Sequence, residues 1–238
     1  MAVARDASSP GAVAGTYSSG ATTCTFTSGS FSPPANSLIV FSVPAPQSAI
    51  PFVFNLPTNT GTPLTWNQLA VEQIEGDGGV AVFWAYNSAA QSGITCTQVT
   101  NLNSGYPMGS GCIDVWTGTA GNFTGAALVQ ANGNTGAGNV AITTTAAGSQ
   151  VAGIYFADFS YNYPPSSTDV AEAIWGAAYQ NLGLCAYKAT PVATAGATYL
   201  NFTDTGTPGE TFYIVYEILA GAPPGPTVPA GGGVFVEC

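Results

Sequence analysis

The chain has 238 residues, of which two are basic, twelve are acidic and none is histidine, so its formal net charge is −10. The lack of histidine excludes Ser-His-Asp and Cys-His catalysis and histidine-ligated zinc, and two basic residues cannot neutralise the phosphates of a nucleic acid or bind an anionic membrane surface. Hydrophobic residues make up 46% of the chain and charged residues 6%, which indicates a globular protein with a neutral polar surface and not a disordered one.

Strand patterns follow one another along the chain and are separated by turns rich in Gly, Asn, Ser and Pro. The β-branched run at 37–43 is the first, and the apolar run at 80–86 is typical of a strand buried on both faces. A glycine cluster at 76–79 separates it from the strand pattern at 64–74, so these two segments predict a β-hairpin. The further predicted strands are 93–100, 112–117, 139–145, 150–159, 171–179, 184–189, 197–202 and 211–219.

Only the segment 169–179 also fits a helix, because Val170, Ile174 and Ala178 would share one helical face. Trp175-Gly176 and the flanking turns favour a strand with a bulge. Ten to twelve strands without alternating helices exclude a parallel α/β sheet and leave a sandwich, a jelly roll or a barrel. We predict an all-β fold, an antiparallel β-sandwich of jelly-roll type with flexible Gly/Pro-rich termini.

The two ends differ in composition from the middle of the chain. Residues 1–15 are rich in Ala, Ser and Gly and predict an N-terminal arm, followed by a single β-sandwich domain at 16–220. Residues 221–238 predict a Pro/Gly-rich C-terminal arm that ends in a short strand. The arm residues Val234, Phe235, Val236 and Cys238 are candidates for strand addition to a neighbouring subunit, although a frayed end or a strand that folds back onto its own domain fits equally well.

Five cysteines, at 24, 96, 112, 185 and 238, show no C-x-x-C spacing of a metal or redox site. Buried free thiols that act as small hydrophobic side chains are the main expectation. Cys96 and Cys112 are the best candidates for a disulfide, because the turn-rich segment between them can place two strands side by side. Asp6 and Pro10 interrupt the apolar core that a secretory signal needs, so we expect synthesis in the cytoplasm.

Acidic side chains are the only candidates for catalysis in this composition. Glycoside hydrolysis needs two carboxylates roughly 5–9.5 Å apart, and the sequence alone cannot place any two of these side chains at that separation. We therefore predict no enzyme, no catalytic residue, no cofactor and no metal site. The aromatic and amide-rich segment 158–169 offers Tyr161, Asn162 and Tyr163 as candidate contacts to a partner protein or a glycan; an ordered loop that covers one end of the fold is the alternative.

Several segments together resemble the surface proteins of tailed-phage virions, over roughly residues 20–220. The segments that carry this resemblance are 37–41, 82–86, 93–97, 114–118 and 142–149. The resemblance is one of pattern and brings no catalytic motif. It implies a β-sandwich on the virion surface, either a head decoration (cement) protein or a fibre component.

The function we expect is that of a non-enzymatic virion structural protein that decorates and stabilises a phage capsid through protein–protein contacts. Its expected partners are the major capsid protein or another virion protein and further copies of itself, without nucleic acid or membrane. Its expected location is the virion surface, after assembly in the host cytoplasm. Two alternatives stay open: a receptor-binding or tail-fibre protein that recognises host glycan, and a self-assembling extracellular filament subunit that donates a strand.

Overall fold

The structure is a computed structural model that describes residues 2–16, 22–46, 53–74, 78–101, 109–132, 138–157, 165–177, 180–203 and 210–221. Within these ranges the protein is all-β, and its strands form curled antiparallel sheets. No helix in the described ranges could cross a membrane.

The largest sheet has nine strands, in the order β5-β8-β3-β2-β9-β4-β7-β6, with β1 paired to β9. It curls so that β3 and β8 face β4 and β7 across a first core, which includes Phe26, Phe41 and Phe83. Its strands are β1 (Ala4–Arg5), β2 (Gly11–Thr16), β3 (Thr23–Thr27), β4 (Ser37–Pro46), β5 (Thr58–Asn59), β6 (Trp66–Ile74), β7 (Gly78–Asn87), β8 (Cys96–Asn101) and β9 (Ser110–Thr117).

A second sheet of five strands has the order β10-β16-β12-β14-β13. One of its faces packs on β4, β7 and β9 across a second core, which includes Leu38, Trp116 and Phe212. Its strands are β10 (Thr119–Asn132), β12 (Gln150–Ala157), β13 (Val170–Ala177), β14 (Gln180–Tyr187) and β16 (Glu210–Ala220). The two-stranded ribbon of β11 (Asn139–Thr144) and β15 (Gly196–Asn201) covers the other face across a third core.

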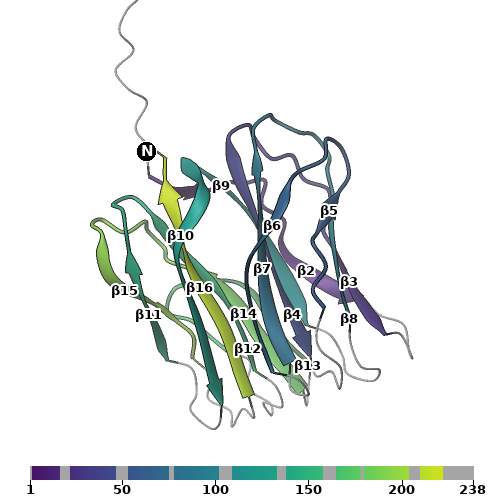
Figure 1. Cartoon of the computed structure of the whole chain (residues 1–238), viewed down its shortest axis with the longest axis vertical. Coiled ribbons are helices and arrows are strands. Elements are labelled where there is room, and N and C mark those ends of the chain that lie inside the picture. Colours follow the sequence, from purple (N-terminus) through teal and green to yellow (C-terminus); the bar gives the residue numbers. More distant parts are fainter. Residues whose placement is uncertain are drawn as a thin grey trace, which may run out of the picture.

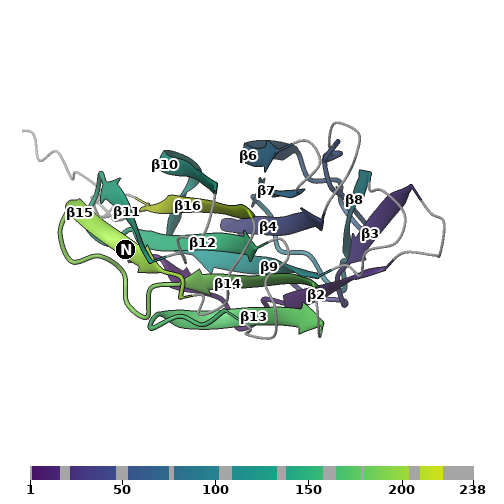
Figure 2. The same cartoon turned by 90° about the horizontal axis from the view of Figure 1, so that it is seen from below.

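Figure 1 shows these layers side by side, from the β11–β15 ribbon at the left, through the five-stranded sheet, to β4, β6 and β7 and then β3, β5 and β8 at the right. The view in Figure 2 shows the same succession from below, with β12 and β14 beside β4 and β9. The layer of β4, β7 and β9 therefore lies in the middle of the molecule and is covered on both sides.

Side-chain alternation explains why this middle layer is apolar on both faces. In β4, Ile39 and Phe41 point into the first core, while Leu38 and Val40 point into the second. In β9, Ile113 and Val115 point into the first core, and Cys112 and Trp116 point into the second. Successive strand residues alternate between faces, so Asp114 joins Cys112 and Trp116 between the two sheets.

The chain passes from the first sheet to the second at Gly118, between β9 and β10. Gly118 has a φ of 71°, and a Cβ on this residue would lie 2.4 Å from the backbone oxygen of Ala2. Only glycine fits this left-handed conformation so close to another backbone segment. The sheet-to-sheet crossing and the N-terminal segment are therefore packed against each other.

The predicted strands from 37 to 219 are confirmed, with shifts of a few residues at their ends. The hairpin of 64–74 with 79–86 is present as β6 and β7. The segment 169–179 contains a strand with a bulge, as predicted, and not a helix. The sequence prediction missed β1, β2, β3, β5 and β10, which are short or rich in Ala, Gly and Thr.

The N-terminal arm was expected at residues 1–15, but the described part of it, residues 2–15, belongs to the nine-stranded sheet. Val3 and Val13 are buried, β1 and β2 pair with β9, and β2 also pairs with β3. Alanine and glycine gave this segment little apolar signal of its own, but long-range pairing with β9 fixes it in the sheet. The predicted C-terminal arm, beyond residue 221, lies outside the described residues.

The fully buried ring of Phe41 gives a test of the first core. We expect Phe41→Ala to lower the free energy of unfolding by about 3–5 kcal/mol, because it removes a large side chain and leaves a cavity. Leu56→Ala is the control, since Leu56 is 54% exposed and its loss is expected to change stability by less than about 0.5 kcal/mol. Chemical denaturation of both variants measures the difference, and equal stabilities would contradict the assigned core.

Candidate functional site

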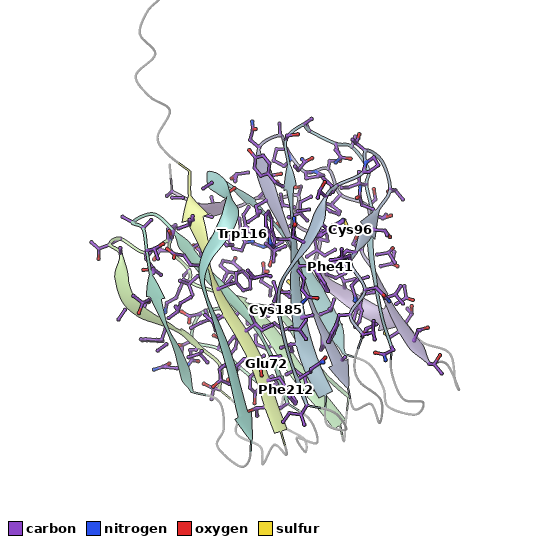
Figure 3. All side chains as sticks on the ribbon, in the orientation of Figure 1. Phe41, Glu72, Cys96, Trp116, Cys185 and Phe212 are labelled. Carbon is purple, nitrogen blue, oxygen red and sulfur yellow. The ribbon has the colours of Figure 1, made fainter. Side chains whose placement is uncertain are left out.

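A group of polar side chains lies between the two large sheets, inside the second core. It consists of Arg5 from β1, Cys112 and Asp114 from β9, Glu172 from β13 and Cys185 from β14, and we call it the inter-sheet cluster. In Figure 3 the labelled Cys185 and Trp116 mark this region in the middle of the molecule, away from Phe41 and Cys96 of the first core.

Strand register brings these residues together. Arg5 pairs with Trp116 across β1 and β9, and Cys185 pairs with Ala173 across β14 and β13. In β13, Ala171 pairs with Ala186 and Ala173 pairs with Cys185, which leaves Glu172 as an extra residue in a β-bulge. A bulge redirects a side chain, and at this bulge the side chain of Glu172 extends toward β9.

Arg5 is the positive charge of the cluster. Its Nε donates a hydrogen bond to Asp114 Oδ1 at 2.9 Å and also contacts Glu172 Oε1. The side chains of Asp114 and Glu172 are 9% and 7% exposed. Burial alone would lower the pKa of Arg5, but the neighbouring charges of Asp114 and Glu172 outweigh this effect and raise it, so the guanidinium stays charged.

Glu172 holds a proton in this environment. Burial, followed by the charge of Asp114, raises the pKa of Glu172 to about 9. Its protonated carboxyl group can donate to Asp114 while its other oxygen accepts from Arg5. Because Glu172 keeps its proton, the cluster buries one negative charge fewer, which limits the cost of burying it.

Two thiols complete the cluster. Cys112 Sγ lies 3.4 Å from Asp114 Oδ2 and 3.4 Å from Glu172 Oε2. Cys112 and Cys185 are hydrogen-bond partners, although they belong to different sheets. The hydrogen bond to Cys185 and burial raise the pKa of Cys112, and burial raises the pKa of Cys185, so both remain thiols at neutral pH.

Aromatic side chains surround the cluster. The rings of Trp116 and Tyr187 meet edge to face, with centroids 5.4 Å apart. Tyr216 is buried, and burial, followed by the charge of Asp114, raises its pKa. Apolar walls of this kind exclude water, which strengthens the pairing of Arg5 with its acceptors.

The ligand atoms of Cys112, Asp114 and Glu172 lie within 4.8 Å of one another, as in a metal site. However, Arg5 already contacts both carboxyl groups and supplies the positive charge there. The same contact argues against a glycosidase pair, because the two carboxyl groups face each other in a buried, occupied space. The arrangement is chemically suited to holding sheets together and to reactions of the thiol pair.

Cys96 and Cys112, expected as a disulfide, are free thiols in the structure. They cannot pair, because Cys96 lies in the first core and Cys112 in the second, on opposite faces of the middle layer. The candidate contact residues Tyr161, Asn162 and Tyr163 lie outside the described residues, as do the candidate arm residues Val234, Phe235, Val236 and Cys238. The roles predicted for these seven residues therefore stay predictions.

Sequence reasoning missed the inter-sheet cluster. The alternation of Cys112, Asp114 and Trp116 was the available signal, since it places a carboxylate on a face with apolar neighbours. A buried carboxylate needs a cationic or hydrogen-bonding partner, and the chain has two basic residues to choose from. Arg5 was not recognised as that partner, because residues 1–15 were expected to form an arm outside the domain.

Comparison with known proteins identifies no relative: no family model matches the chain, and no curated protein or solved structure matches it either. The functional interpretation therefore depends on the residues and their geometry.

The proton on Glu172 predicts a pH dependence of stability. Between pH 4.5, the ordinary pKa, and about 9, the folded protein holds a proton that the unfolded chain has released. Stability therefore falls as pH rises through this window, by at most about 1.4 kcal/mol per pH unit from this group. Glu172→Gln mimics the protonated form and is expected to flatten the fall. Denaturant titrations from pH 5 to 9 compare the two proteins, and parallel curves would refute the assignment.

Removal of Arg5 is expected to be costly. Arg5→Met leaves Asp114 buried without its cation, and we expect a loss of about 3 kcal/mol of stability at pH 7. Lys188→Met is the matched control, because Lys188 is the other basic residue and pairs with Asp169 at 2.9 Å. Asp169 is 9% exposed, like Asp114, but it also accepts from the backbone N–H of Asn201, and Lys188 contacts one carboxyl group where Arg5 contacts two, so this control is expected to lose less stability. Denaturation midpoints give the comparison, and a smaller loss for Arg5→Met than for Lys188→Met would contradict it.

Proposed function

We propose that the protein is a non-enzymatic structural protein of a virion surface, which decorates and stabilises a phage capsid through protein–protein contacts. Its partners in this proposal are the major capsid protein or another virion protein, together with further copies of itself. The observation that carries the proposal is a broad, uncharged, threonine-rich face on the outer layer of the nine-stranded sheet.

This threonine face covers neighbouring strands β2, β3, β8 and β5. Thr27 pairs with Thr97, which pairs with Thr58, and Thr16 pairs with Thr25. The hydroxyl groups of Thr27 and Thr97 are 3.1 Å apart, and those of Thr60 and Thr95 are 3.3 Å apart. The threonines of the face are Thr16, Thr23, Thr25, Thr27, Thr58, Thr60, Thr95 and Thr97, and each is exposed or half-buried.

No charged residue occurs in the segments that build this face, which are 11–16, 23–27, 53–60 and 95–101. Val53 and Leu56, 51% and 54% exposed, lie beside it and add apolar surface. A rigid sheet that presents methyl and hydroxyl groups offers shape and neutral hydrogen bonds to a partner protein. Protein interfaces are depleted in charge at their centres in the same way.

The two basic residues and one buried acidic residue serve the interior of the molecule instead. Arg5 and Lys188, the only basic residues of the chain, both form ion pairs with carboxyl groups of low exposure. Glu217 is buried and accepts hydrogen bonds from the backbone of Thr145 and Ala146. This use of charge stabilises the body and leaves its described basic groups with no role in attracting a nucleic acid or an anionic membrane.

The layered sheets support a β-sandwich interpretation of the fold, because each pair of facing layers encloses its own apolar core. The jelly-roll connectivity remains a prediction of the sequence analysis. A stacked all-β body of this kind suits a protein whose task is to be rigid and to present flat surfaces.

Glycan recognition is the second candidate, and one hollow favours it. The hollow has a volume of about 440 Å³ and is lined by Asp169, Lys188 and a series of hydroxyl and apolar groups at 189–194 and 197–198. Lys188 lies 4.4 Å from the centre of the Tyr199 ring, which is 45% exposed. Exposed aromatic and hydroxyl groups are the kind that contact sugars.

A single charge on the threonine face tests the proposal. We expect Thr27→Glu to reduce incorporation into particles about tenfold or more, because an unpaired charge would be buried in the contact. Thr143→Glu is the matched control, an exposed threonine on the distant ribbon strand β11. Particles assembled with each variant are purified, and the copies per particle are counted by mass spectrometry and located by cryo-EM.

Normal incorporation of Thr27→Glu would refute the threonine face as the contact. Copies found only at the tail tip, with glycan binding lost in a Tyr199→Ala variant, would favour receptor recognition. Filaments formed by the protein alone would favour strand donation.

A further inference from the structure

Among the cysteines of the described residues, Cys112 and Cys185 are neighbours, whereas Cys24 and Cys96 are not. Both are buried, they come from facing strands of two different sheets, and their side chains are in hydrogen-bond contact. Cα atoms of β9 and β14 approach within 8 Å of one another. The strands that carry the two cysteines therefore face each other closely across the second core, which is the arrangement that a disulfide between two sheets needs.

We infer that Cys112 and Cys185 are a disulfide-forming pair, which links the two sheets covalently when the protein meets a disulfide oxidant. This inference stands on the two side chains alone and does not depend on the proposed function.

The chemistry is thiol–disulfide exchange with a small disulfide such as oxidised glutathione. The thiolate of one cysteine attacks a sulfur of the small disulfide, breaks its S–S bond and releases one small thiol. The second protein thiolate then attacks the mixed disulfide, forms the Cys112–Cys185 bond and releases the second small thiol. The two protein thiols are oxidised, one small disulfide is reduced to two thiols, and the protein's two protons pass to these products.

Burial determines when this reaction occurs. Both thiols are enclosed, and their pKa values are raised, so the folded reduced protein reacts slowly. Oxidation is therefore expected during folding, or during openings of the second core, and not by direct attack on the closed structure. Once formed, the bond is protected from reductants by the same burial.

The other two described cysteines provide an internal comparison. Cys24 pairs with Thr100 across β3 and β8, whereas Cys96 lies four positions further along β8. At about 3.3 Å per strand residue, these two positions are too far apart for a disulfide. Burial raises the pKa values of Cys24 and Cys96 to about 12 as well. The position of the side chains, and not the acidity of the thiols, therefore distinguishes Cys112 and Cys185 from Cys24 and Cys96.

The experiment refolds the full-length chain with oxidised glutathione, and in parallel with a reductant, and maps linked peptides by mass spectrometry without reduction. We expect one intramolecular link, between the peptides that contain Cys112 and Cys185, and a higher melting temperature than that of the reduced protein. Unlinked thiols after oxidative refolding, glutathione adducts on Cys112 or Cys185 without a link, or a link that uses Cys24 or Cys96 would overturn the inference.

Variants make the assignment independent of the mapping. Cys24→Ala with Cys96→Ala is expected to keep both the link and the rise in melting temperature, while Cys185→Ala is expected to lose both. A rise of the same size in Cys185→Ala would overturn the inference. Since an alanine variant can fail to fold, the peptide map of the unmodified chain decides by itself whether the pair forms.

Discussion

The packing of the two large sheets depends on the pairing of Arg5 with Asp114 and Glu172 in the core between them. Two carboxyl groups in an apolar space would repel each other and resist burial, and a single guanidinium satisfies both. Because Arg5 lies on β1, the first residues of the chain are needed to complete a core built by strands more than a hundred residues later. The N-terminal segment is thus a structural part of the body, held also by Val3, whose backbone N–H donates to Gly148.

The bulge at Glu172 shows how backbone geometry and electrostatics depend on each other. In a regular strand, alternation would turn residue 172 away from the face that Cys185 shares with the second core. The extra residue breaks the register between Ala171 and Ala173 and accompanies the approach of the carboxyl group to Arg5 and Cys112. The proton that Glu172 retains removes one negative charge from the buried cluster. The bulge and the raised pKa of Glu172 therefore both help this carboxyl group to be buried.

Particular residues explain what the sequence allows one to predict. Runs such as 37–43 and 80–86 are apolar on both faces, and this marks them as central strands without knowledge of their partners. The strands β2 and β3 carry one or two buried residues each among Ala, Gly and Thr, so their pairing depends on β8 and β9, far away in the sequence. The Cys96–Cys112 prediction was wrong for a related reason: spacing along the chain does not show which core a cysteine faces. Arg5, Asp114 and Glu172 are brought together only by the sheet topology, which no local pattern contains.

The distribution of charge links the interior to the proposed contact surface. A protein with this net charge repels further copies of itself at long range, and ionic strength screens that repulsion. The threonine face carries no charge, so contacts made through it are not steered by electrostatic attraction and must depend on shape and on neutral hydrogen bonds. Such contacts form slowly from dilute solution, and between copies of this chain they form more readily when salt screens the repulsion. A molecule that confines its cations to internal ion pairs and presents a neutral sheet outside is therefore suited to lasting assembly, in which partners are held at high local concentration and rapid capture is not required.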